Sequence, residues 1–266
     1  MQTNTTRDKT IDFIKGILIL FVILGHTTLG LTDMYSFDDT MNGIANVIYS
    51  FHMPCFIAVS GFLYSEYVGN VSQGIFSRIC HKAFNILLPY VMISVIYWII
   101  KFALSNLIRE PVAVSSLISI PWKPIEFLWY LYALFLIYCV AYMADYVFAR
   151  LLPHFNYKME LLFVLFLIIA LTCYGSFHYE GFNYIAGFQM YFYLGCLIKK
   201  WLDKLDNRYA VLSLSVMSVL VEVSDIVLRD DMSSNPIFSS LFERLTACIV
   251  TVSYTHLRAH ETAANL

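Results

Sequence analysis

Long apolar runs separated by short polar segments dominate the chain between residues 11 and 252. A membrane-spanning helix needs about 20 predominantly apolar residues, and these runs approach or reach that length. The pattern predicts about eight spans, over residues 11–31, 44–64, 84–104, 126–147, 160–174, 182–198, 209–228 and 237–252. The fifth and sixth are short or interrupted by glycine, so we expect them to be tilted or partly re-entrant. The chain is therefore predicted to be all-α, a polytopic transmembrane helical bundle.

Composition supports a membrane protein rather than a soluble one. Of the 266 residues, 59% are hydrophobic and 14% are charged, and the mean hydropathy is +0.67. A soluble domain carries about 25% charged residues, so no separate solvated domain is predicted. The net charge of −2 gives no indication of a nucleic-acid partner, and the six cysteines lack the CxxC spacing of a metal site. We expect one transmembrane domain over residues 1–252, embedded in a lipid bilayer and without a metal.

The distribution of basic residues predicts the orientation. With a cytoplasmic N-terminus, ten lysines and arginines fall on inner segments and four on outer ones. The positive-inside rule then favours this orientation. The inner residues are Arg7, Lys9, Arg78, Lys82, Arg150, Lys158, Lys199, Lys200, Lys204 and Arg208.

Residues 253–266 do not continue the pattern. They break the last apolar run abruptly, and their wording resembles translated sequencing-adapter read-through. We therefore exclude His256 and His260 from any site. The natural protein is expected to continue with further helices.

Three ionisable residues, Asp12, Lys15 and His26, lie inside the first apolar run. At ~100° and ~1.5 Å per residue, Lys15 and His26 share one helix stripe and are roughly 16 Å apart along its axis. Asp12 falls within about 40° of the same stripe. Ionisable groups inside a membrane indicate a functional site. Two structural alternatives stay open: Lys15 reaching the interface while paired with Asp12, and His26 hydrogen-bonded to a neighbouring helix.

The same residues carry a family resemblance. The spacing of Arg7, Asp12, Lys15 and His26 resembles the first helix of the acyltransferase-3 family of membrane O-acyltransferases. Residues 51–63, FHMPCFIAVSGFL, are similar to that family's second-helix block, and residues 128–134, LWYLYAL, are similar to a later run. Within the family, the chain is most similar in pattern to the fucose 4-O-acetylase-like branch.

The resemblance implies a multi-pass O-acyltransferase of the bacterial cytoplasmic (inner) membrane. Cytosolic acyl-CoA, in particular acetyl-CoA, would supply the acyl group as a substrate, with no bound cofactor. The acceptor would be a hydroxyl of a cell-surface carbohydrate or its precursor. His26 would act as general base or take part in relaying the acyl group. Lys15 would contact the donor or the developing oxyanion, and Asp12 would position Lys15.

Four further residues are candidates for substrate binding: His52, Ser60, Glu126 and Trp129. Each has an ordinary structural alternative. Ser60 and the following Gly61 suit close helix packing, and Glu126 suits the membrane interface. Apart from Lys15, the sequence assigns no residues to donor binding.

A transporter or flippase is the competing hypothesis. Asp12, Lys15, His26 and His52 would then line a path for a substrate or for protons. The two halves of the sequence show no evident inverted repeat, which disfavours this alternative.

Overall fold

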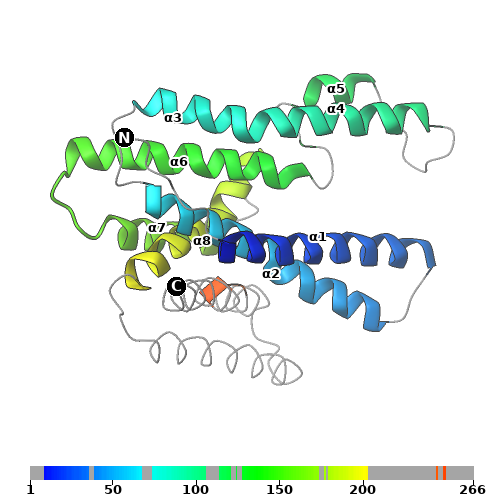
Figure 1. Ribbon diagram of the computed structural model, residues 1–266, viewed down its shortest axis with the longest axis horizontal. Coiled ribbons are helices and arrows are strands. Elements are labelled where there is room, and N and C mark those ends of the chain that lie inside the picture. Colours follow the sequence, from blue (N-terminus) through cyan, green and yellow to red (C-terminus); the bar gives the residue numbers. More distant parts are fainter. Residues whose placement is uncertain are drawn as a thin grey trace. The chain divides into compact units, whose positions relative to one another are not determined.

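A computed structural model of the chain describes residues 9–35, 39–67, 74–105, 114–120, 124, 128–173, 177, 179–202, 244 and 248–249. These residues form helices and connections and contain no strand. The helices are α1 (Lys9–Tyr35), α2 (Asp39–Tyr67), α3 (Ile75–Lys82), the π-helix η2 (Ala83–Leu87), α4 (Leu88–Ala103), α5 (Val114–Ser119), α6 (Trp129–Leu151), α7 (Lys158–Cys173) and α8 (Glu180–Leu202) (Figure 1).

The all-α prediction is confirmed for this part of the chain. Among the described residues, three helical segments are long and apolar enough to cross a membrane: Ile11–Thr28, Ile75–Ala103 and Trp129–Leu151. The stretch Phe51–Ser65 is apolar but shorter. The count of about eight spans and the N-terminal orientation stay predictions. The expected spans at 209–228 and 237–252 lie almost wholly outside the described residues, as does the 253–266 tail.

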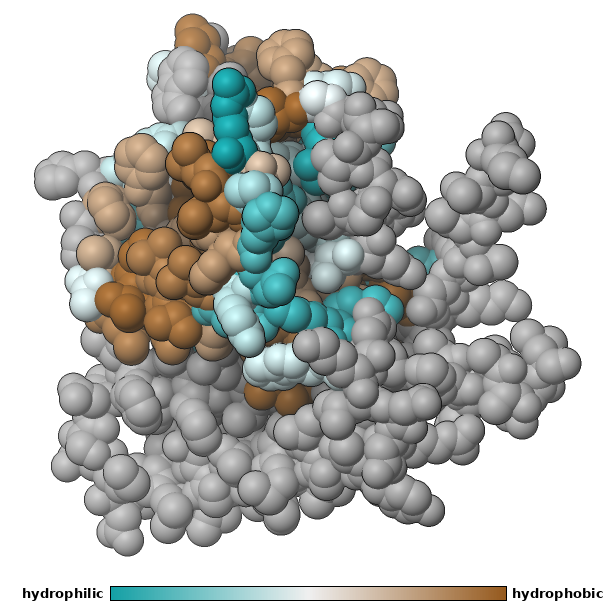
Figure 2. Space-filling model, turned by 90° about the vertical axis from the view of Figure 1, so that its left-hand side faces the viewer, coloured by the Kyte–Doolittle hydropathy of each residue, from teal (hydrophilic) through white to brown (hydrophobic). Residues whose placement is uncertain are grey.

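Large apolar side chains remain exposed on these helices. Phe13 and Leu20 on α1 are each 60% exposed, and Leu151 at the end of α6 is 70% exposed. Figure 2 shows hydrophobic side chains gathered over part of the described surface beside a band of hydrophilic ones. Exposed apolar surface on this scale is unfavourable in water but not against lipid tails. The helices are those of a multi-pass integral membrane protein.

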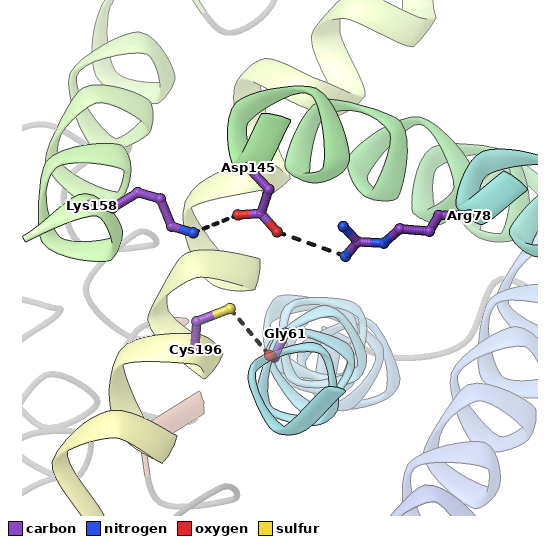
Figure 3. A network of polar contacts seen from close by, with 5 residues as sticks. All are labelled: Gly61, Arg78, Asp145, Lys158 and Cys196. Carbon is purple, nitrogen blue, oxygen red and sulfur yellow. Dashed lines mark hydrogen bonds and ion pairs between the residues drawn. The ribbon is translucent and has the colours of Figure 1, made fainter. Parts of the chain in front are cut away.

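The chain divides into two compact units, Met1–Gly69 with Tyr191–Leu266, and Asn70–Met190. In the first unit α2 packs against the C-terminal part of α8 through two glycines. A Cβ added at Gly61 would lie 1.9 Å from the carbonyl oxygen of Phe192, and one added at Gly195 would lie 1.9 Å from that of Ala58. Cys196 Sγ donates a hydrogen bond to the Gly61 carbonyl at 3.1 Å (Figure 3). The close packing predicted at Ser60-Gly61 is confirmed for Gly61.

The second unit contains α3 through α7 and the start of α8. From Ile75 to Ala103 the chain is one helical segment, and the π-turn of η2 ends two residues before Pro89. Proline has no N–H to donate to the fourth residue before it, and a π-turn accommodates that loss. Asp145 of α6 pairs with Lys158 of α7 at 2.6 Å and with Arg78 of α3 at 3.8 Å (Figure 3). These ion pairs connect three helices within this unit.

Candidate functional site

The polar residues of α1 lie beside its packing face. Ile11, Ile14, Leu18 and Gly25 are buried, and their spacing places them on one stripe of the helix. Asp12, Lys15 and His26 are half-buried. At ~100° per residue, Lys15 and His26 are about 20° apart around the axis and border the buried stripe. They lie at the edge of the helix contact rather than on the fully exposed face.

Helix α2 packs against α1 (Figure 1). Next to His26, Gly25 leaves room for this contact. A Cβ at Gly25 would lie 3.1 Å from both Ile48 Cγ2 and Tyr49 Cε2. Those contacts would be tighter than ordinary van der Waals distance. The glycine therefore lets the Tyr49 ring lie directly against the α1 backbone.

Tyr49 in turn reaches the next residue of α1. Its hydroxyl and Nδ1 of His26 are hydrogen-bonded at 2.8 Å. The two rings meet edge-to-face, with centroids 5.6 Å apart and an interplanar angle of 87°. Both the hydrogen bond and the ring contact fix the orientation of the His26 imidazole.

His52 lies one turn further along α2 and is fully buried. Its Nδ1–H donates to the carbonyl of Ile48 at 2.5 Å, which leaves Nε2 as the acceptor of the neutral ring. The Nε2 atom is buried and has no hydrogen-bond partner among the described residues. The His52 ring also lies edge-to-face on Tyr49, with centroids 5.0 Å apart. Tyr49 thus lies between the two histidines and contacts both of them.

The other predicted substrate-binding residues lie elsewhere. Ser60 Oγ donates to the Phe56 carbonyl at 2.9 Å, a bond within α2. In the second unit the Trp129 ring stacks on Tyr184 at 5.1 Å and contacts Phe188 at 5.4 Å. Glu126 falls outside the described residues. Substrate binding by these residues and by His52 stays a prediction.

Sequence reasoning missed Tyr49 and Gly25. Gly25 directly precedes His26, and Tyr49 lies three residues before His52, where a helix brings side chains onto one face. Those spacings were the available signal. Within the described residues, no group of three or more His, Cys, Asp or Glu side chains is placed to hold a metal ion. The chemistry that this arrangement offers is proton transfer by an imidazole whose Nδ1 is hydrogen-bonded to Tyr49.

Comparison with known proteins places these helices in a family. The acyltransferase-3 family model, described as an acyltransferase domain, matches residues 8–224. The chain is 30% identical over 157 residues to the nodulation protein NolL of Mesorhizobium japonicum. The aligned region covers 58% of this chain and 38% of that protein. The chain is 38% identical over 84 residues to the nodulation protein NolL of Sinorhizobium fredii, covering 31% of this chain and 22% of that protein. The chain thus spans less than half the length of these relatives. No solved structure matches it.

Proposed function

Because the chain belongs to the acyltransferase-3 family, we propose that it is a membrane O-acyltransferase that moves an acyl group, in particular acetyl, from cytosolic acyl-CoA to a carbohydrate hydroxyl. The family match covers α1 to α8, and therefore His26 and its contacts with α2. The same match does not favour the transporter alternative. We place the enzyme in the cytoplasmic membrane of a bacterium and its acceptor among surface carbohydrates or their precursors.

His26 acts as the general base in this proposal. Nδ1 is the nitrogen bonded to Tyr49, so we assign proton acceptance to Nε2. Nε2 takes the proton of the acceptor hydroxyl while the hydroxyl oxygen attacks the thioester carbonyl carbon. The carbon–sulfur bond then breaks, the ester forms, and the coenzyme A thiolate leaves with the proton that the imidazolium returns.

Lys15 serves the donor at a distance from the reacting carbonyl. Lys15 lies eleven positions before His26, which is roughly 16 Å along a helix at ~1.5 Å per residue. A lysine side chain cannot cover that distance to the oxyanion that forms beside His26. We therefore assign Lys15 to another part of the acyl-CoA, where its charge matches the phosphates. Asp12, three residues before Lys15, positions the lysine side chain.

The observation that carries the proposal is the hydrogen bond from α2 that holds His26 inside the family-matched region. An imidazole fixed in one orientation is what general-base catalysis requires, because the accepting nitrogen must face the hydroxyl. A half-buried position next to the helix contact also keeps the ring away from bulk lipid.

The test is acyl transfer by membranes that contain the full chain. His26→Ala should abolish incorporation of radiolabelled acetyl from acetyl-CoA into glycan while the protein still accumulates in the membrane. His154→Ala is the matched control, because His154 is exposed in the turn between α6 and α7. Retained incorporation in His26→Ala would remove the catalytic assignment. Substrate flux across the membrane without incorporation, in the unsubstituted protein, would support transport instead.

A further inference from the structure

Tyr49 contacts the proposed base His26 but takes no part in the bond changes of the proposed reaction. It contacts His26 through its hydroxyl, His52 through its ring, and the α1 backbone through the space that Gly25 leaves. All of these contacts lie within the first compact unit. A side chain held on three sides transmits its own orientation to the imidazole that it binds.

The hydrogen bond to Tyr49 determines which tautomer of His26 can act as the general base. A neutral imidazole carries one hydrogen on its two nitrogens, so Nε2 accepts a proton only when that hydrogen is on Nδ1. Nδ1–H then donates to the Tyr49 hydroxyl oxygen. If the tyrosine hydroxyl donated instead, Nε2 would carry the hydrogen and the ring would be unable to accept a proton there. The role of Tyr49 is therefore specific to its oxygen atom.

We propose that Tyr49 is the positioning residue of His26: its hydroxyl oxygen accepts the Nδ1 hydrogen, selects the tautomer with a basic Nε2, and binds the imidazolium during transfer. This inference rests on the proposed role of His26 as the base. Gly25 and His52 support it indirectly. Gly25 leaves space for the tyrosine ring. His52, which is hydrogen-bonded to the Ile48 carbonyl, packs edge-to-face against the same ring.

The geometry gives two variants that disturb the bond in different ways. Tyr49→Phe removes only the oxygen and keeps the ring between Gly25 and His52. Gly25→Ala keeps the hydroxyl but adds a Cβ 3.1 Å from the ring carbon Cε2, so the ring must shift by a few tenths of an ångström. Alanine is a better helix former than glycine, so Gly25→Ala does not weaken α1 itself.

Kinetics test the proposal in membranes containing the full chain. Tyr49→Phe should lower kcat roughly 10- to 100-fold, the effect expected for a hydrogen bond to a group that becomes charged, with KM for acetyl-CoA unchanged. Gly25→Ala should lower kcat less, again without changing KM. Tyr64→Phe is the matched control, because it removes a hydroxyl from the same helix and leaves its ring against Phe192. It should retain the kcat of the unsubstituted protein.

A spectroscopic measurement keeps the test independent of activity. In protein with ¹⁵N-labelled histidine, His26 should give the signals of one fixed tautomer with hydrogen on Nδ1, and Tyr49→Phe should give mixed tautomers. Unchanged kcat and tautomer in Tyr49→Phe, with His26→Ala inactive, would overturn the positioning role and leave the base intact. Activity retained in His26→Ala would overturn the proposed function itself. If Tyr49→Phe does not accumulate, the tautomer in the unsubstituted protein and the kcat of Gly25→Ala decide the question.

Discussion

The contact between α2 and α8 predicts that Gly195→Ala destabilises the protein. The added Cβ would lie 1.9 Å from the carbonyl oxygen of Ala58, whereas ordinary van der Waals contact begins at 3.4 Å. The atom it meets belongs to the backbone of a helix, so a side-chain rotation cannot relieve the overlap. The two helices must separate by about 1.5 Å at this point, a distance at which most of the dispersion attraction between facing atoms is lost.

The size of the effect follows from two opposing contributions. Overpacking costs about 3 kcal/mol when the surroundings cannot adapt. Alanine in place of glycine inside a helix returns about 1 kcal/mol. Separation of the helices also breaks the hydrogen bond from Cys196 to the Gly61 carbonyl, which is 3.1 Å long. We therefore expect a net loss of about 2 kcal/mol, which lowers Tm by about 4–8 °C for a chain of this size.

This loss is measured by heating the detergent-solubilised protein and monitoring its thermal unfolding with size-exclusion chromatography. Gly30→Ala on α1 is the matched control, since a Cβ there meets nothing within 4 Å, and its Tm should be unchanged or slightly higher. Gly61→Ala should behave as Gly195→Ala does, because it meets the Phe192 carbonyl at the same 1.9 Å. Equal Tm values for Gly195→Ala and Gly30→Ala would refute the close crossing.

Three further predictions follow from individual contacts. Asp145→Asn should lower stability by about 2 kcal/mol, since it leaves the partly buried cations Arg78 and Lys158 without their carboxylate; a Tm equal to that of the unsubstituted protein would contradict this. Lys15→Ala should raise KM for acetyl-CoA with a smaller effect on kcat, and the reverse pattern in steady-state kinetics would oppose its assignment to the donor. Trp129→Ala should lower Tm more than Trp129→Phe does, because an aromatic ring is retained in the latter; a change in acceptor KM with equal Tm would favour substrate binding instead.

The long helices were predictable from the sequence, because they are built from runs of apolar residues, whereas the short helices α3 and α5 were not predicted. The expected span 11–31 lies within α1, 44–64 within α2 and 182–198 within α8. The resemblance at His26 and at residues 51–63 also indicated the family that the comparison found. Hydropathy and short motifs report local properties of the chain, so they suffice for both conclusions.

Contacts between helices were not predictable in the same way. Gly61 was expected to pack closely, but nothing in its surroundings in the sequence indicated that Phe192 would lie against it. Tyr49 lies 23 residues from His26, and a tyrosine in an apolar run carries no signal that its hydroxyl binds a particular histidine. Such pairs depend on which helices meet and at what height, and local periodicity contains neither.

The hydrogen bond between Tyr49 and His26 is also what the structural alternative for His26 requires, namely a membrane histidine bonded to a neighbouring helix. Magnitudes separate the two interpretations. A bond that only joins helices is worth about 0.6 kcal/mol in a membrane, so its loss lowers stability slightly and leaves kcat unchanged. A bond that selects the tautomer of a reacting base acts on every turnover, so its loss lowers kcat far more than a stability change of that size explains. Comparing Tm and kcat of Tyr49→Phe in the same preparation therefore decides whether α2 only packs against α1 or also prepares His26 for chemistry.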